Sequence, residues 1–301
     1  MTPAEALPCT LALPANFRVA ELLAFHRRDS QALAERVEAQ QLRKGLILHG
    51  EPACLQLEFD TTQVHAELRW QHRAGHADDG ALAALLRHLL GLQQDIEGFE
   101  ARHGGHPQLG ALLARQRGLR VAQAATPFEA LSWAITGQQI SLAAALSLRR
   151  RLILACGVAA GHGLLCYPDA RAVAALPAET LRQAGFSASK TRTLQSVAQQ
   201  VLDGTLALDD WLQTRPIEVI RQRLLAVRGI GPWTVDYTLL RGYGWLDGSL
   251  HGDAAVRRAL QGLLGSTQRI EAAQAQDWLA AFAPWRALLA AHLWAMSSTA
   301  A

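Results

Sequence analysis

Lysine, cysteine and long apolar runs are scarce in this sequence of 301 residues, and each shortage excludes a class of protein. The only lysines are Lys44 and Lys190, so the last third of the chain has no amine for covalent catalysis. The four cysteines form no CxxC pair, which indicates reduced thiols of a cytoplasmic protein rather than a zinc site or a disulfide framework. The most apolar stretch, residues 287–296, is interrupted by His292 and is too short to span a bilayer. No basic segment precedes the first apolar residues, which argues against a signal peptide.

The net charge is only +3, but the basic residues gather in the middle of the chain. Residues 1–100 carry a net charge of −5 and residues 201–301 a net charge of zero. Residues 101–200 contain eleven basic and three acidic residues, a net charge of +8. Such a region favours a polyanionic partner. An arginine-rich solvated surface would give the same pattern, so charge alone leaves both interpretations open.

The apolar patterns predict a small α+β domain at 1–104, followed by a mainly α core at 105–301. In the first domain, segments 9–14, 45–50, 54–59 and 64–70 have the length of strands and predict an antiparallel sheet. Helical spacing occurs at 17–28 and 81–102. In the core, Thr126 and Glu129 have the spacing of a capping box, which begins a helix there. Further helices are predicted at 141–155, 169–175, 178–184, 189–202, 216–226, 232–242, 253–263, 269–281 and 284–296.

The stretch from 224 to 244 reads "LLAVRGIGPWTVDYTLLRGYG" and places a Gly-Ile-Gly turn between two apolar segments with helical spacing. A dinucleotide-binding loop would need a third glycine where Thr234 stands, and it would follow a strand. Two interpretations remain open from the residues alone. The turn is either an ordinary helical hairpin, or a hairpin whose second helix offers free N–H groups to a phosphate.

A single carboxylate, Asp253, stands at the start of the next predicted helix, in "HGDAAVRRAL". Its simplest role is that of an N-cap, which accepts from the backbone N–H groups of Ala255 or Val256. The same place also suits a carboxylate that faces a ligand. One side chain can fill both roles.

These motifs together resemble the helix-hairpin-helix (HhH-GPD) superfamily of base-excision DNA glycosylases, and in particular its AlkA-type 3-methyladenine DNA glycosylase II branch. Other segments agree with the resemblance: "TPFEALSWAITGQQISLAAA", "LRQAGFSASKTRTLQSVAQQV", "FAPWRALLAAHLWAM" and, near the N-terminus, "LPANFRVAELLAFHRR…GLILHG". It extends from about Leu11 to Met296. It implies a core of two helical subdomains with a DNA cleft between them, preceded by the α+β domain.

The resemblance assigns the chemistry to Asp253. A base to be removed must leave the duplex stack, and the sugar then develops positive charge that a carboxylate can stabilise. The pocket for the base is expected to be aromatic, because a cationic alkylated base is attracted to the faces of aromatic rings. By resemblance this pocket comprises Trp233, Tyr237, Trp294 and Phe25. Plain core packing is the alternative explanation for each of these aromatic residues, and it is favoured for Phe25.

The resemblance also implies residues that contact DNA. These are Gly229, Ile230, Gly231 and Thr234 at the turn, and Gln139 as the side chain that fills the gap left by a flipped base. The backbone carbonyls of Leu225, Val227 and Ile230 could hold a structural Na⁺ or K⁺, or they could simply end a helix. No other cofactor is expected. In particular, the last cysteine is Cys166, which excludes the iron–sulfur branch of the family.

The predicted function is therefore hydrolysis of the N-glycosidic bond of alkylated bases in double-stranded DNA, by a cytoplasmic, nucleoid-associated bacterial monomer without a membrane partner. Glycosylases that also cut the strand carry a lysine just after the hairpin glycines, and Pro232 and Trp233 stand there instead, which predicts no lyase step. Small residues, Ala254 and Ala255, replace bulky ones after Asp253, which leaves the base preference open. Alternatives are removal of deaminated or oxidised purines, a non-catalytic DNA-binding or lesion-sensing protein, and a helical scaffold.

Overall fold

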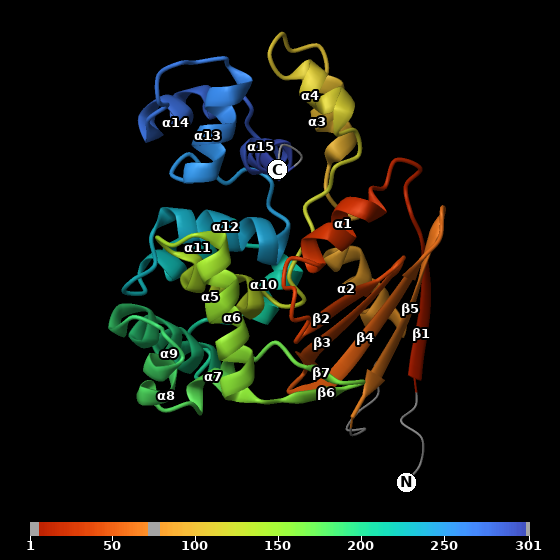
Figure 1. The fold of residues 1–301 in the computed structure, drawn as a ribbon, viewed down its shortest axis with the longest axis vertical. Helices are drawn as coiled ribbons and strands as arrows, with labels where there is room; N and C mark the ends of the chain where they lie inside the picture. Colours follow the sequence, from red (N-terminus) through yellow and green to blue (C-terminus); the bar gives the residue numbers. More distant parts are fainter. Residues whose placement is uncertain (1–5, 72–78, 299–301) are drawn as a thin grey trace.

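The N-terminal domain is built on an antiparallel sheet of five strands. The computed structural model describes residues 6–71 and 79–298, drawn in colour in Figure 1. The strands are β1 (Ala6–Ala12), β2 (Glu35–Glu38), β3 (Gln41–Leu48), β4 (Glu51–Phe59) and β5 (Gln63–Trp70), in the order β1-β5-β4-β3-β2. Helix α1 (Val19–His26) packs against β2 and β3, and α2 (Asp79–Leu89) packs against β1. The predicted sheet is confirmed, with β2 as a polar edge strand that its short sequence did not reveal.

The helix predicted over 81–102 was wrong, because the chain forms two helices there, α2 and α3 (Ile96–His103). Gly91 between them has a φ of +65°, a backbone conformation that ends a helix. Asp95 then caps α3, since its side chain accepts a hydrogen bond from the Gly98 backbone N–H. The end of α2 is therefore marked by Gly91 and the start of α3 by Asp95, whereas the apolar spacing continues across both residues.

Helices fill the rest of the chain, as predicted. They are α4 (Gly110–Arg115), α5 (Pro127–Gly137), α6 (Leu142–Cys156), α7 (Ala170–Ala174), α8 (Ala178–Gln183), α9 (Ala188–Leu202), α10 (Leu208–Thr214), α11 (Ile217–Leu225), α12 (Pro232–Tyr243), α13 (Ala254–Leu263), α14 (Ala272–Ala280) and α15 (Arg286–Ser298). A small hairpin, β6 (Ala159–Gly161) and β7 (Leu164–Leu165), follows α6. Helices α4 and α10 and this hairpin were not predicted. Of the described helices, none is long and apolar enough to cross a membrane.

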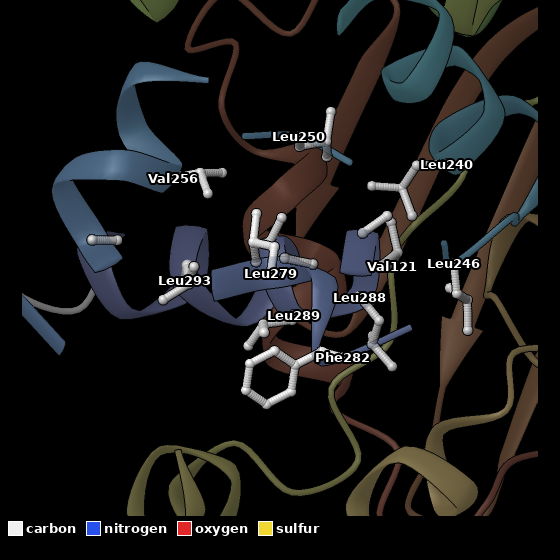
Figure 2. Close-up of a cluster of buried hydrophobic side chains, with 14 of the residues drawn as sticks. Val121, Leu240, Leu246, Leu250, Val256, Leu279, Phe282, Leu288, Leu289 and Leu293 are labelled. Atoms are coloured by element: carbon white, nitrogen blue, oxygen red, sulfur yellow. The ribbon is translucent and has the colours of Figure 1, made fainter. Parts of the chain in front are cut away.

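The three largest hydrophobic clusters divide the molecule into three parts. One lies under the sheet of the N-terminal domain, and a second joins α5 to α12. The third joins α12–α15 with the segment 96–121, and Figure 2 shows Phe282 of this cluster close to Leu288 and Leu289 of α15. Ile96 and Phe99 belong to this third cluster although they precede residue 104. The predicted domain boundary at 104 thus falls after residues that already pack with the C-terminal helices.

A buried network of charges joins the N-terminal domain to the helical core. Lys44 of β3 donates to Glu35 of β2 over 2.6 Å and to Glu129 of α5 over 2.7 Å. Arg149 of α6 and His26 of α1 also face Glu35, at 3.3 and 3.1 Å. Burial alone would raise the pKa of Glu35, but Lys44, Arg149 and His26 hold that pKa well below its ordinary value. Likewise, burial would lower the pKa of Lys44, but Glu129 and Glu35 raise it.

This network also corrects the predicted capping box. Thr126 caps α5, because its hydroxyl accepts from the Glu129 backbone N–H over 3.1 Å. The Glu129 side chain does not return to Thr126. It accepts instead from the Ala125 backbone N–H over 3.0 Å and pairs with Lys44. The predicted hydrogen bond from the Glu129 backbone N–H to the Thr126 hydroxyl is confirmed. The predicted return contact of the Glu129 side chain is absent, because this carboxylate pairs with Lys44 of the N-terminal domain.

Candidate active site

A tight turn joins α11 to α12 and leaves the N-terminus of α12 without a side-chain cap. Gly229 has a φ of +93°, and the Ile230 backbone N–H donates to the Val227 carbonyl over 3.1 Å. Gly231 is the N-cap of α12, and Pro232 occupies its first turn. Because glycine has no side chain, the N–H groups at the positive end of the helix dipole remain available to an anion. The predicted helical hairpin is confirmed.

Replacing Gly229 by alanine should damage this turn. A Cβ at 229 would lie 2.2 Å from the Thr193 hydroxyl oxygen, which donates to the Arg228 carbonyl. We expect the free energy of unfolding to fall by about 1–3 kcal/mol, from the positive φ and the lost hydrogen bond. Urea unfolding measures this loss, and Gly204→Ala is the matched control, since its φ is +79° with nothing within 4 Å. Equal losses in the two variants would contradict the expected clash.

The end of α5 is tied to this turn by Gln138. Its side-chain Nε2 donates to the Gly229 carbonyl and to the Thr234 hydroxyl, each over 2.9 Å. Thr234 is only 2% exposed, so its hydroxyl faces Gln138 and not solvent, which argues against the direct phosphate contact expected for it. Gln139 is exposed with a φ of +56°, and the next residue, Ile140, is also exposed. The position expected to fill the gap of a flipped base therefore stands at the surface, beside an apolar side chain.

The turn also contains the carbonyls expected to bind a monovalent cation. The Val227 carbonyl accepts from Ile230 but keeps a second lone pair. Within the described chain, the Leu225 and Ile230 carbonyls accept no hydrogen bond outside the helices. These oxygen donors fit a hard cation such as Na⁺ or K⁺. The ion itself stays a prediction.

Asp253 stands at the N-terminus of α13 and is surrounded by N–H donors. Its Oδ1 accepts from the backbone N–H groups of Ala255 over 2.8 Å and of Val256 over 3.0 Å, as predicted for an N-cap. The indole of Trp233 donates to Oδ2 over 3.0 Å, and that of Trp294 to Oδ1 over 3.3 Å. The carboxylate is therefore fixed in orientation by α12, α13 and α15 together. The sequence alone gave no sign of the two indole contacts.

Of the four predicted pocket residues, Trp233 and Trp294 contact this carboxylate, and Tyr237 packs against both of their rings. Trp233 and Tyr237 are four residues apart on α12, and their ring centroids lie 5.3 Å apart. Tyr237 lies 6.1 Å from the Trp294 ring on α15. Phe25 of α1 is not in ring contact with them. It is linked to Trp294 through Arg241, whose guanidinium carbon lies 4.4 Å from the Phe25 centroid and 5.8 Å from that of Trp294.

Two family models match the chain. That of the HhH-GPD superfamily of base excision DNA repair proteins matches residues 132–281, and that of the AlkA N-terminal domain matches residues 9–126. The chain belongs to the HhH-GPD superfamily. The HhH-GPD match covers the turn between α11 and α12 and most of the helical core. The AlkA N-terminal match covers almost all of the described five-stranded sheet.

Named relatives of this HhH-GPD protein agree with the assignment. The chain is 30% identical over 219 residues to a probable bifunctional transcriptional activator/DNA repair enzyme AlkA of Mycobacterium tuberculosis, covering 70% of this chain and 42% of that one. It is 29% identical over 190 residues to DNA-3-methyladenine glycosylase 2 of Escherichia coli, and the match covers 62% of this chain and 63% of that one. The chain thus spans about half the length of the curated relatives it matches. A 3-methyladenine DNA glycosylase structure from Archaeoglobus fulgidus shares the fold, with a TM-score of 0.81 over 95% of this chain and 97% of that one, at 22% identity.

The HhH-GPD site also contains residues that the sequence did not indicate. The Trp133 indole donates to the Tyr237 hydroxyl over 2.9 Å, which fixes that ring. Arg28 and Arg241 line a pocket that also includes Phe25, Trp133 and Tyr237. In "FHRR" only one of the two adjacent arginines reaches this pocket, since Arg27 is exposed. Nothing in the linear sequence distinguishes them.

Both lysines of the chain are engaged away from the carboxylate of this HhH-GPD site. Lys44 belongs to the buried charge network. Lys190, at the start of α9, donates to the Thr136 carbonyl over 2.7 Å. Of the small residues after Asp253, Ala254 is exposed, and Ala255 serves the carboxylate through its backbone.

Proposed function

We propose that the protein is a DNA glycosylase that hydrolyses the N-glycosidic bond of alkylated bases, of the 3-methyladenine and 7-methylguanine type, in double-stranded DNA. The observation that carries this proposal is the Asp253 carboxylate, held among tryptophans close in the chain to the uncapped N-terminus of α12. The name of the Escherichia coli relative, DNA-3-methyladenine glycosylase 2, supplies the alkylated substrate class.

Binding in this proposal begins with the DNA backbone. A phosphate is held by the free N–H groups at Gly229 and Gly231, since the Ile230 N–H already donates to the Val227 carbonyl. The carbonyls of Leu225, Val227 and Ile230 would hold a Na⁺ or K⁺ that adds positive charge to this turn. The target base then leaves the stack, and Gln139, with Ile140 beside it, fills the gap. The flipped base stacks against Trp233, Tyr237 and Trp294, whose faces attract an alkylated base because it is cationic.

Bond cleavage then relies on the fixed charge of Asp253. As the glycosidic bond breaks, the electron pair leaves with the base and positive charge develops on the sugar, which the carboxylate stabilises. Oδ1 already accepts three hydrogen bonds, whereas Oδ2 accepts only from Trp233. Oδ2 therefore keeps a lone pair for the attacking water. The products are the free base and an abasic site.

The proposed enzyme is a monofunctional monomer acting on nucleoid DNA. Both lysines have other partners, so no amine is placed to form a Schiff base with the sugar. No iron–sulfur cluster takes part, because no cysteine follows Cys166.

Incubation with methylated duplex DNA tests the proposed function. We expect free 3-methyladenine and 7-methylguanine in the supernatant, detected by chromatography, and a DNA strand that breaks only after alkali treatment. Borohydride should trap no covalent complex. Strand cleavage without alkali, or a trapped complex, would show a lyase step and refute monofunctionality. DNA binding without base release would refute the glycosylase itself.

A further inference from the structure

The loop that leads to Asp253 is attached to the first turn of α15 by a pair of opposite charges. This loop, residues 244–253, joins α12 to α13 and contains no helix or strand. Arg286, the first residue of α15, donates from Nε to one oxygen of Asp247 over 2.7 Å and from Nη2 to the other over 2.9 Å. Two parallel hydrogen bonds of this kind fix the orientation of the partners as well as their distance.

Backbone contacts join the same two segments. The Leu246 carbonyl accepts from the Ala287 N–H over 2.7 Å and from the Leu288 N–H over 3.2 Å. The first turn of a helix leaves such N–H groups without partners inside the helix, so the loop supplies a cap for α15. Leu246 and Leu250 are also buried in the third hydrophobic cluster, where Figure 2 shows them. The loop is therefore part of the packed core.

The position of Arg286 is unfavourable for α15 considered alone. A cation in the first turn of a helix lies at the positive end of the helix dipole, where acidic residues are preferred. Helix α15 has no acidic residue in that turn. Asp247 supplies the negative charge from the loop instead. The pairing with the loop, rather than the stability of the helix, thus accounts for an arginine at this position.

The loop is also held from the side of α12. A Cβ added to Gly248 would lie 3.0 Å from the Asp236 Cβ, so glycine allows the loop to approach this helix closely. Asp236 is only 3% exposed and pairs with Arg221 of α11. The guanidinium carbon of Arg221 in turn lies 5.7 Å from the ring centroid of Trp245 in the loop. Helix α12 and Arg286 therefore fix the loop from two directions.

Helix α15 also contacts the carboxylate at the end of this loop. Trp294 lies eight residues after Arg286 on the same helix. Its indole donates to Oδ1 of Asp253 over 3.3 Å, which is at the long end of hydrogen-bond distances. A small shift of α15 relative to the loop would break this contact. The pair at the start of the helix thus controls a contact in its middle.

We propose that the Arg286–Asp247 pair positions Asp253 for base release. The pair is a positioning element, because it holds the loop and α15 at the separation that brings Asp253 and Trp294 together. This inference rests on the proposed glycosylase function. A displacement of about 1 Å at a reacting group can lower a rate on the order of 10²-fold. The N–H groups at the Gly229 turn are untouched, so loss of the pair should slow bond cleavage without weakening DNA binding.

Substitutions of Arg286 test this proposal. Arg286→Met should lower the single-turnover rate of 3-methyladenine release by at least about 10-fold, with the Kd for a methylated duplex within about 2-fold of the wild type. Arg286→Lys keeps the charge but not the two parallel hydrogen bonds, so its rate should fall between the two. Arg120 pairs with Glu97 of α3 over 2.8 Å, and Arg120→Met is the matched control. It should lower the urea midpoint but not the rate.

Two further measurements separate positioning from a general loss of stability. Combining Arg286→Asp with Asp247→Arg restores opposite charges and should recover part of the lost rate. The ¹⁵N indole signal of Trp294, identified as the one missing in Trp294→Phe, gives a readout that needs no substrate. It should shift in Arg286→Met and in Asp253→Asn, because each changes the acceptor of this indole.

The outcomes distinguish this inference from the function it rests on. A wild-type rate in Arg286→Met, or a loss of DNA binding as large as the loss of rate, would overturn the positioning role. If the wild type releases no base, the glycosylase proposal fails, and an unchanged Trp294 signal in Arg286→Met would overturn the positioning as well. If Arg286→Met does not fold, a wild-type rate in Arg286→Lys overturns the proposal, and recovery in the exchanged pair supports it.

Discussion

Asp253→Asn is expected to release methylated bases at least about 10²- to 10³-fold more slowly than the wild type, with the fold and DNA binding retained. Asparagine is as good an N-cap as aspartate, so α13 keeps its cap through Ala255 and Val256. What is lost is the negative charge that stabilises the sugar. The asparagine Nδ2 also cannot accept from the Trp233 indole, which donates to Oδ2 in the wild type.

Single-turnover base release, anisotropy with a labelled duplex and thermal unfolding together test this expectation. Asp210→Asn, exposed on α10, is the matched control and should behave as the wild type does. Trp233→Phe, which removes the indole donor but keeps an aromatic ring, should cost far less than the loss of the charge. If Asp253→Asn retains the wild-type rate, the residue is only a helix cap and the assigned mechanism is wrong.

Lys44→Met is expected to lower the free energy of unfolding by about 3–5 kcal/mol, the usual cost of leaving buried charges unpaired. The ammonium group lies 2.6 Å from a Glu35 oxygen and 2.7 Å from a Glu129 oxygen, and all three side chains are buried. Without it, only Arg149 and the neutral His26 face these two carboxylates. The loss should appear in the urea midpoint.

Lys190→Met is the matched control for this variant. Lys190 is partly exposed and donates only to the Thr136 carbonyl, so its removal should cost about 1 kcal/mol. Adding Glu35→Gln to Lys44→Met should recover part of the loss, because one unpaired charge is then removed. Similar losses from Lys44→Met and Lys190→Met would contradict the cost assigned to the buried network.

Features encoded by neighbouring residues were predictable from the sequence. The Gly229 turn, the cap formed by Asp253 and the shared face of Trp233 and Tyr237 each depend on residues at most four positions apart. Features that depend on other domains were not. In the sequence Lys44 looks like an ordinary strand residue, because its partner Glu129 belongs to α5 in another domain. The inward direction of Arg28 depends likewise on the packing of α1 against the helical core.

The partners of small polar side chains were also not predictable from the sequence. The Thr234 hydroxyl suits a phosphate by its place after the turn, but Gln138 from another helix occupies it. Periodicity likewise predicted one helix where Gly91 divides two, because apolar spacing continues across the break. In both cases the sequence identified the correct region, and a contact or a single backbone angle decided the detail.

The passage of segment 96–121 through the C-terminal cluster has a consequence for how the protein is made. Phe99 and Leu112 belong to the same cluster as Leu279 and Leu289, which are synthesised much later. Contacts so distant in sequence form slowly, because a long intervening chain must first be brought together. A growing chain therefore carries exposed apolar side chains until α14 and α15 have emerged, and such side chains promote aggregation. The Trp294 side of the aromatic site is likewise assembled only when α15 has emerged.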